Sequence, residues 1–184
     1  MAIVNFDENK VLLGCVKNDL ACQRLLYEHH KIAMFTICLR YATDRSDAED
    51  MLQDGFIQVF KAIHQYDATR GVFEAWMRKV FVNTALQQIR KKKMSFVEIN
   101  DSQHQFSTDE DVVSQLSIKE LLTHIQQLPT GYRTVFNMYV IDGMQHNEIA
   151  EQLQISVNTS KTQLFKAKQI LKKTITAAQN VTTH

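Results

Sequence analysis

Proline and glycine are scarce in this sequence, whose 184 residues include one proline and five glycines. Both residues commonly interrupt helices or mark turns, so their scarcity leaves long uninterrupted segments. Alternation of polar and apolar residues, the pattern of a half-buried strand, is also rare, whereas apolar residues recur at intervals of three and four. The sequence therefore predicts an all-α fold.

Cysteine is present only three times, at Cys15, Cys22 and Cys38. An odd number of cysteines without metal-ligand spacing excludes a disulfide framework and a structural zinc site as the basis of the fold. Each cysteine lies inside an apolar helical stretch. We therefore expect reduced thiols in the core of a cytosolic protein.

Long apolar runs and a basic leader are also missing. No segment approaches the roughly 20 apolar residues that span a bilayer, and the opening residues MAIVNFDENK do not form a secretion signal. We expect a cytoplasmic protein with no direct membrane insertion.

Common catalytic motifs are absent, because the chain has neither a glycine-rich phosphate loop nor an HExxH motif. An enzyme could still be built around Glu28-His29-His30, or around His146 and Glu148, but neither cluster has a known metal spacing. Adjacent histidines on a helix point about 100° apart and seldom share a ligand. We expect no catalytic residue, no cofactor and no metal ion.

A strong basic charge is lacking as well, since the net charge is +1. The charge is unevenly distributed: it is +3 over residues 1–94, −5 over residues 95–128 and +3 over residues 129–184. A protein that binds DNA alone usually has a stronger basic balance. The pattern favours a protein that contacts DNA at two places and depends on a partner for the rest.

What the sequence does contain is clearest near its C-terminal end. Apolar residues within 149–153 give one helix an inward face, and Gln154-Ile155-Ser156 forms a turn. Ser156 or Asn158 can cap a second helix, Thr159 to Lys173, whose outward residues are hydroxyl, amide and cationic. Two such helices around a tight turn are typical of a helix-turn-helix that reads DNA.

Another helix start is predicted at Ser46-Asp47-Ala48-Glu49, a capping box in which the Ser46 side chain and Glu49 bond reciprocally. Apolar residues then repeat every three or four positions to residue 63, and acidic residues crowd the first two turns. An acidic face of this kind is usually only a solvated surface.

A third helix is predicted from Val72 to Lys93, after the loop of residues 65–71. Cations at its end suit both the negative end of the helix dipole and DNA phosphates. Rings interleaved with cations and amides can bind single-stranded DNA, although Phe73, Trp76 and Phe81 are more typical of a core. Polar and acidic residues without helical period follow at 95–111 and indicate a linker.

Three segments together resemble one protein family: DAEDMLQDGFIQVFKAI at 47–63, FEAWMRKVFVNTALQQIRKKK at 73–93, and LPTGYRTVFNMYVIDGMQHNEIAEQLQISVNTSKTQLFKAKQIL at 128–171. They resemble the extracytoplasmic-function sigma factors, small alternative initiation subunits of bacterial RNA polymerase. The resemblance covers roughly residues 20–172. It implies two small helical domains joined by a flexible linker at 95–111. Residues 1–94 would bind polymerase and open the minus-ten element, and the helix-turn-helix domain, 112–184, would read the minus-thirty-five element.

The resemblance also implies roles for individual residues. Those expected to bind the polymerase are Asp50, Gln53, Asp54, Gln58 and Phe60. Those expected to contact minus-ten DNA are Tyr66, Asp67, Arg70, Arg78, Lys79, Asn83 and Arg90. Those expected to contact minus-thirty-five DNA are Thr159, Ser160, Lys161, Gln163, Lys166 and Lys168.

Two positions depart from the family pattern. Asn158 stands where the turn usually has glycine, and asparagine tolerates a left-handed backbone better than most residues. Gln163 stands where many members have arginine, and an amide is matched to the edge of adenine rather than guanine. The resemblance therefore leaves the promoter sequence open.

The implied partners are core RNA polymerase, through the beta-prime clamp helices and the beta flap, promoter DNA, and an anti-sigma factor. The alternative is a stand-alone, two-domain helix-turn-helix regulator that binds its operator without polymerase. The near-neutral charge and the acidic helix of residues 47–63 fit that alternative poorly.

Overall fold

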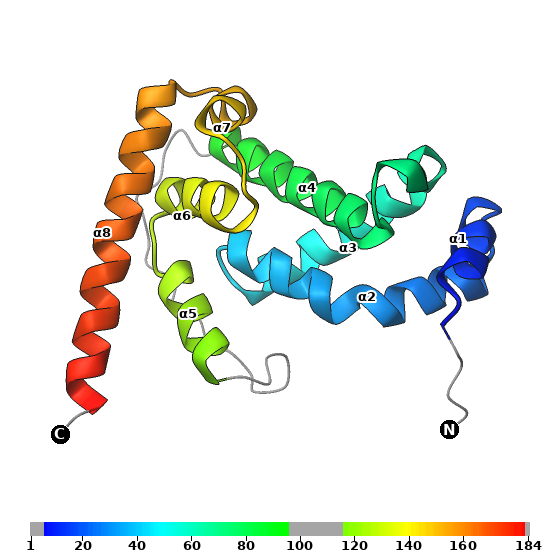
Figure 1. The fold of residues 1–184 in the computed structure, drawn as a ribbon, viewed down its shortest axis with the longest axis horizontal. Helices are drawn as coiled ribbons and strands as arrows, with labels where there is room; N and C mark the ends of the chain where they lie inside the picture. The colour runs from blue at the N-terminus through cyan, green and yellow to red at the C-terminus, as the bar shows by residue number, and fades with distance from the viewer. Residues whose placement is uncertain (1–5, 96–115, 183–184) are drawn as a thin grey trace.

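The fold was established from a computed structural model, which describes residues 6–95 and 116–182. All regular elements in these two ranges are helical, so the all-α prediction is confirmed (Figure 1). The N-terminal group comprises α1 (Glu8–Val16), α2 (Leu20–Tyr41), α3 (Arg45–Ala62), the short 3-10 turns η1 (Ile63–Gln65) and η2 (Ala68–Arg70), and α4 (Phe73–Ser95). The C-terminal group comprises α5 (Leu116–Gln126), α6 (Thr130–Phe136), the π-helical turn η3 (Asn137–Ile141), α7 (His146–Leu153) and α8 (Val157–Thr182).

The start of α3 differs from the predicted capping box. Asp44, not Ser46, is the N-cap, and its carboxylate accepts a hydrogen bond of 2.8 Å from the Asp47 N–H. The Asp47 carboxylate in turn accepts one of 2.8 Å from the Thr43 N–H. The return bond thus reaches Thr43, the residue before the N-cap, and not the N-cap itself. The predicted box at Ser46 and Glu49 is therefore wrong, and the helix begins two residues earlier, because Asp44 and Asp47 have the same spacing.

Close packing of α2, α3 and α4 forms the N-terminal core. Phe56 of α3 and Phe81 of α4 meet edge to face, with ring centroids 5.2 Å apart. A Cβ on Gly55 would lie only 2.2 Å from the Phe81 ring, so α3 can approach α4 this closely only with glycine there. Phe73 and Phe81 are buried and Trp76 is half-buried, as expected of core residues rather than an exposed stacking platform.

The cysteines lie in or beside this core. Cys15 and Cys38 are buried, Cys22 is half-buried, and all three are free thiols. Burial raises the pKa of Cys15 to about 11 and that of Cys38 to about 12. Both thiols are therefore protonated and unreactive near neutral pH.

The two helical groups share part of one hydrophobic core. Val135, Met138, Ile149 and Leu164 of the C-terminal group belong to the same buried cluster as the N-terminal residues. A smaller cluster fixes α5 against α8. The predicted linker lies outside the described residues, except for Ser95, which ends α4. None of the described helices is long and apolar enough to cross a membrane.

Candidate polymerase and DNA interfaces

The residues expected to bind polymerase lie along one side of α3. Asp50, Gln53, Asp54 and Gln58 are exposed. Phe60 is half-buried, with its ring 6.0 Å from that of Phe56. Spacings of three and four residues place such positions on one helical face.

One apolar residue on this face was missed by the sequence analysis. Ile57 is 47% exposed and lies three residues after Asp54 and four after Gln53. Asp54 is held by a neighbouring helix, because its carboxylate accepts a hydrogen bond of 2.6 Å from Gln88 Nε2 of α4. The face therefore combines an apolar centre with acidic and amide groups, of which Asp54 is held in place, a composition suited to a protein partner.

The loop between α3 and α4 is ordered by its own side chains. The Tyr66 hydroxyl donates to the Gly71 carbonyl at 3.0 Å, and its ring meets those of Phe73 and Trp76. Asp67 caps η2, and hydrogen bonds from Thr69 hold the pKa of its carboxyl below the ordinary value. Arg70 is 87% exposed, and its Nε lies 3.6 Å from Asp67 Oδ2 in an ion pair at the surface of the loop.

Three of the four α4 residues expected to contact minus-ten DNA share one side of the helix. Lys79, Asn83 and Arg90 are exposed and spaced by four and seven residues. Arg78 lies about 100° around the helix from Lys79. It pairs with Glu74 at 2.8 Å and lines a groove against the C-terminal group. The structure therefore does not bring Arg78 together with the other three.

The turn between α7 and α8 is present as predicted, but its left-handed residue is not the expected one. Ser156 caps α8, since its Oγ accepts a hydrogen bond of 2.9 Å from the Thr159 N–H. The left-handed residue is Gln154, with φ 54°, whereas Asn158 lies within α8. The expectation of a left-handed backbone at Asn158 is therefore wrong. The helix that follows was expected to end near Lys173 and continues to Thr182.

The outward orientation predicted for Ser160 is also wrong. Ser160 is 0% exposed and belongs to the inward stripe that continues through Leu164, Ala167 and Leu171. Its hydroxyl lies 2.9 Å from His146 Nδ1 of α7 and so joins the two helices. Burial, then the cations of Lys161 and Lys168, lower the pKa of His146.

The outward face of α8 carries residues that the sequence analysis had chosen and others that it had missed. Thr159 and Lys166 are exposed as predicted, and Thr162, Phe165 and Gln169 lie beside them. Phe165 is 61% exposed, unusual for so large an apolar side chain. The signal that could have found them is the spacing of three, four and seven residues opposite the buried stripe.

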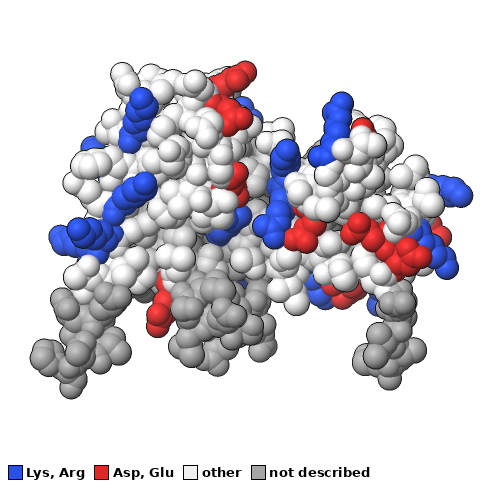
Figure 2. All heavy atoms as spheres, in the orientation of Figure 1, with Lys and Arg blue, Asp and Glu red and all other residues white. Residues whose placement is uncertain are grey.

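The remaining predicted residues flank this outward face. Lys161 and Lys168 are exposed on the side of α7 and η3, with the Lys168 ammonium 5.9 Å from the Tyr139 ring. Gln163 is half-buried on the other side, where a Cβ on Gly131 would lie 3.4 Å from its Nε2. Figure 2 shows cationic side chains gathered over α8 at the left edge of the molecule.

Comparison with known proteins identifies both halves of the chain. Residues 26–94 match the family model described as Sigma-70 region 2, and residues 118–171 match that described as Sigma-70, region 4. The chain is 30% identical over 157 residues to the ECF RNA polymerase sigma factor SigW of Bacillus subtilis, a match that covers 78% of this chain and 83% of SigW. The chain belongs to the extracytoplasmic-function sigma factors.

Two further matches agree with this membership. This sigma factor is 30% identical to SigM of Bacillus subtilis over 151 residues, which are 80% of this chain and 91% of SigM. The fold resembles the sigma factor RpoE of Bartonella quintana, solved in complex with the anti-sigma factor NepR, with a TM-score of 0.51 and 14% identity over 91% of this chain and 96% of that one. The protein is thus an alternative sigma factor that binds core RNA polymerase and directs promoter-specific initiation. The stand-alone regulator is not favoured.

Proposed function

We propose that this sigma factor uses three separate faces in initiation. The exposed side of α3, with Ile57 at its centre, docks on the beta-prime clamp helices. The loop around Tyr66 and the side of α4 that carries Lys79, Asn83 and Arg90 bind the opened minus-ten element. The outward face of α8 enters the major groove at the minus-thirty-five element while the C-terminal domain rests on the beta flap. Two family models in the order of regions 2 and 4 support this division of work.

The DNA assignment rests on the difference between the two opposite faces of α8. One stripe packs on α6 and α7 through Ser160, Leu164 and Ala167, and the opposite face is exposed and rich in hydroxyl, amide and cationic groups. Lysines supply phosphate contacts that are independent of sequence, whereas hydroxyls and amides reach base edges. Thr159, Thr162 and Lys166 lie at the centre of that face by helical spacing.

The same proposal includes an inhibitory partner and a cellular location. The similar RpoE of Bartonella quintana was solved with an anti-sigma factor, and the family to which this chain belongs supports a partner of that class. The protein would act in the cytoplasm, beside its polymerase.

Run-off transcription with sigma-free core polymerase on fragmented bacterial DNA tests the function. Sequenced transcript starts should share two upstream boxes at a fixed spacing.

On the promoter so defined, Lys166→Ala should weaken transcription about tenfold on every variant sequence, because it removes a phosphate contact. Gln163→Ala should change the preferred base at one minus-thirty-five position more than overall activity.

Binding to core polymerase tests the α3 face separately. Ile57→Ala and Asp50→Asn should weaken the complex about tenfold, because they remove the apolar centre and one acidic group of a protein interface. Glu28→Gln is the matched control, because it also replaces an exposed carboxylate by an amide but lies on α2, outside the α3 face. Retained DNA binding without any new transcript starts would instead support a stand-alone regulator.

A further inference from the structure

Polar contacts between distant parts of the chain join the two helical groups at the C-terminal end of α2. Asp142, which follows η3, accepts a hydrogen bond from the Tyr41 hydroxyl. It also pairs with Arg40, whose Nη2 lies 3.3 Å from Asp142 Oδ1. The side chains of this pair are only 9% and 18% exposed. Burial, then the charge of Asp142 and the hydrogen bond to it, raise the pKa of Tyr41 well above its ordinary value.

The same end of α2 is capped by amide side chains of the C-terminal group. Gln126 Nε2 of α5 donates to the Leu39 carbonyl at 3.0 Å, and Asn137 Nδ2 of η3 donates to the Arg40 carbonyl at 2.7 Å. These carbonyls belong to the last turn of a helix, where no partner exists within the helix itself. The contact is therefore specific in geometry, because three side chains of the C-terminal group, Asp142, Gln126 and Asn137, are fitted to one helix end.

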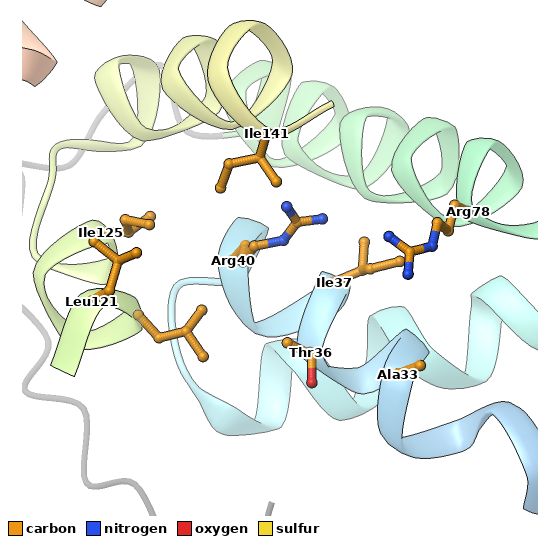
Figure 3. Close-up of a pocket in the computed structure, with 9 residues that line it drawn as sticks. Ala33, Thr36, Ile37, Arg40, Arg78, Leu121, Ile125 and Ile141 are labelled. Atoms are coloured by element: carbon orange, nitrogen blue, oxygen red, sulfur yellow. The ribbon is translucent and has the colours of Figure 1, made fainter. Parts of the chain in front are cut away.

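Several polar atoms at this contact lack a hydrogen-bond partner. In the described part of the chain, Gln126 Oε1, Asn137 Oδ1 and Arg40 Nε are buried without a hydrogen-bond partner. Beside the contact lies an open groove of about 340 Å³, lined by apolar residues of α2 and α5 together with Arg78 and Ile141 (Figure 3). Leu121 and Ile141 on its sides remain 45% and 43% exposed. Unpaired buried polar atoms and an unfilled apolar groove both lower the cost of separating the two groups.

The packed arrangement cannot serve both promoter elements at once. Elements centred near minus ten and minus thirty-five lie about 25 base pairs apart, which is about 85 Å of duplex at roughly 3.4 Å per base pair. A compact chain of 184 residues has a radius of gyration of about 16 Å and is therefore about 40 Å across. In addition, Arg78 on α4, one of the residues expected to contact minus-ten DNA, lines the groove against the C-terminal group, although its side chain is 56% exposed. The two DNA-reading faces must move apart before they can occupy one promoter.

We propose that the contact of Asp142 with Tyr41 and Arg40 is an autoinhibitory latch, which holds the free sigma factor closed until polymerase binding releases it. The inference rests on the proposed division of the chain into two promoter-reading faces. Removal of the latch lowers the population of the closed form, and the fraction of molecules ready to bind polymerase rises accordingly.

Asp142→Asn tests the latch, because it removes the charge that Arg40 faces and keeps the size of the side chain. In small-angle scattering of the full chain without polymerase, the radius of gyration should rise by about a fifth. At limiting core polymerase, run-off transcription should rise about threefold to tenfold, with no difference at saturating polymerase. Tyr41→Phe removes one donor and leaves the charge pair, so it should give a smaller change in the same direction.

Glu28→Gln is the matched control, since it breaks an exposed ion pair with Lys31 within α2 and should match the wild type in both measurements. An unchanged radius of gyration for a folded Asp142→Asn chain would show that Asp142 does not hold the groups together. A larger radius with unchanged or lower transcription would show that closure is not inhibitory. If the wild-type chain directs no promoter-specific transcription, the proposed function fails, while the scattering comparison still decides whether the latch exists.

Discussion

His30 is a buried titratable residue within the N-terminal core. Its ring lies beside those of Phe6, His29 and Phe73. Its Nε2 has no hydrogen-bond partner in the described part of the chain. Burial, then the neighbouring His29, lower the pKa of His30, whereas Glu74 acts in the opposite direction. The folded state therefore favours neutral imidazole, and protons bind the unfolded chain more readily.

This residue predicts a loss of stability in mild acid. The pKa of His30 is lowered on folding from a value near 6.5 in the unfolded chain. Neutral His30 therefore makes its full contribution to the free energy of unfolding above pH 6.5, and this contribution falls as the pH drops below 6.5. The midpoint of thermal unfolding should therefore decrease between pH 7.5 and pH 5.5, values that are about one unit either side of the unfolded pKa. His30→Gln should flatten this dependence in part, because His146 also has a lowered pKa.

The exposed His64 provides the control, since His64→Gln removes a titratable ring outside the core. It should leave the wild-type pH dependence unchanged. If the unfolding midpoint depends on pH equally steeply in wild type and His30→Gln, protonation of the His30 ring does not destabilise the fold.

At the scale of single elements, α7 ends in a backbone conformation that its sequence does not favour. Gln154 has φ 54° and ψ 46°, and the chain closes there with a hydrogen bond of 3.0 Å from the Ile155 N–H to the Ala150 carbonyl. A left-handed conformation costs a residue with a Cβ roughly 1 kcal/mol, whereas glycine adopts it freely. Gln154→Gly should therefore stabilise the protein by about 0.5 kcal/mol, because the greater conformational freedom of glycine in the unfolded chain offsets part of the gain.

Chemical denaturation of the Gln154→Gly chain measures this gain. Gln152→Gly, two residues earlier within α7, is the matched control and should destabilise by about 1 kcal/mol, because that position is helical. A loss of stability in both variants would mean that the Gln154 side chain itself contributes to the turn.

These elements show what the sequence could predict. Periodicity was enough to find the helix pair. It also narrowed the cap to Ser156 or Asn158, because a cap depends on neighbours within three residues, and the structure selects Ser156. Ser160 was placed outward because a hydroxyl suits both a DNA face and a helix contact, and only the position of His146 decides between them. Arg78 likewise looks like its neighbour Lys79 in sequence, although the two point in different directions.

At the scale of the whole molecule, the least predictable feature is the contact between the two groups. Tyr41 and Asp142 are 101 residues apart in sequence, and no spacing pattern links the two positions. Sequence patterns report which face of each helix is apolar, but they do not report which of two apolar faces will meet. The division into two helical domains followed from the family resemblance, whereas their shared core came only from the structure.

A shared core predicts cooperative unfolding of the whole chain. Val135 and Met138 of the C-terminal group lie in the same cluster as Phe73 and Met77 of the N-terminal group, so separating the groups exposes apolar surface on both. Trp76 of α4 is the only tryptophan, and its fluorescence reports on the N-terminal group alone. Far-ultraviolet circular dichroism reports on all helices. In the wild-type chain, denaturant should move both signals at one midpoint.

The Asp142→Asn variant should separate these two signals, because it weakens the contact through which one group supports the other. Its dichroism should begin to fall at a lower denaturant concentration than its tryptophan fluorescence, since the smaller C-terminal group then unfolds first. Glu28→Gln should keep the two transitions superimposed. Separate midpoints already in the wild-type chain would mean that the groups fold independently, and that their packing contributes little to the stability of either.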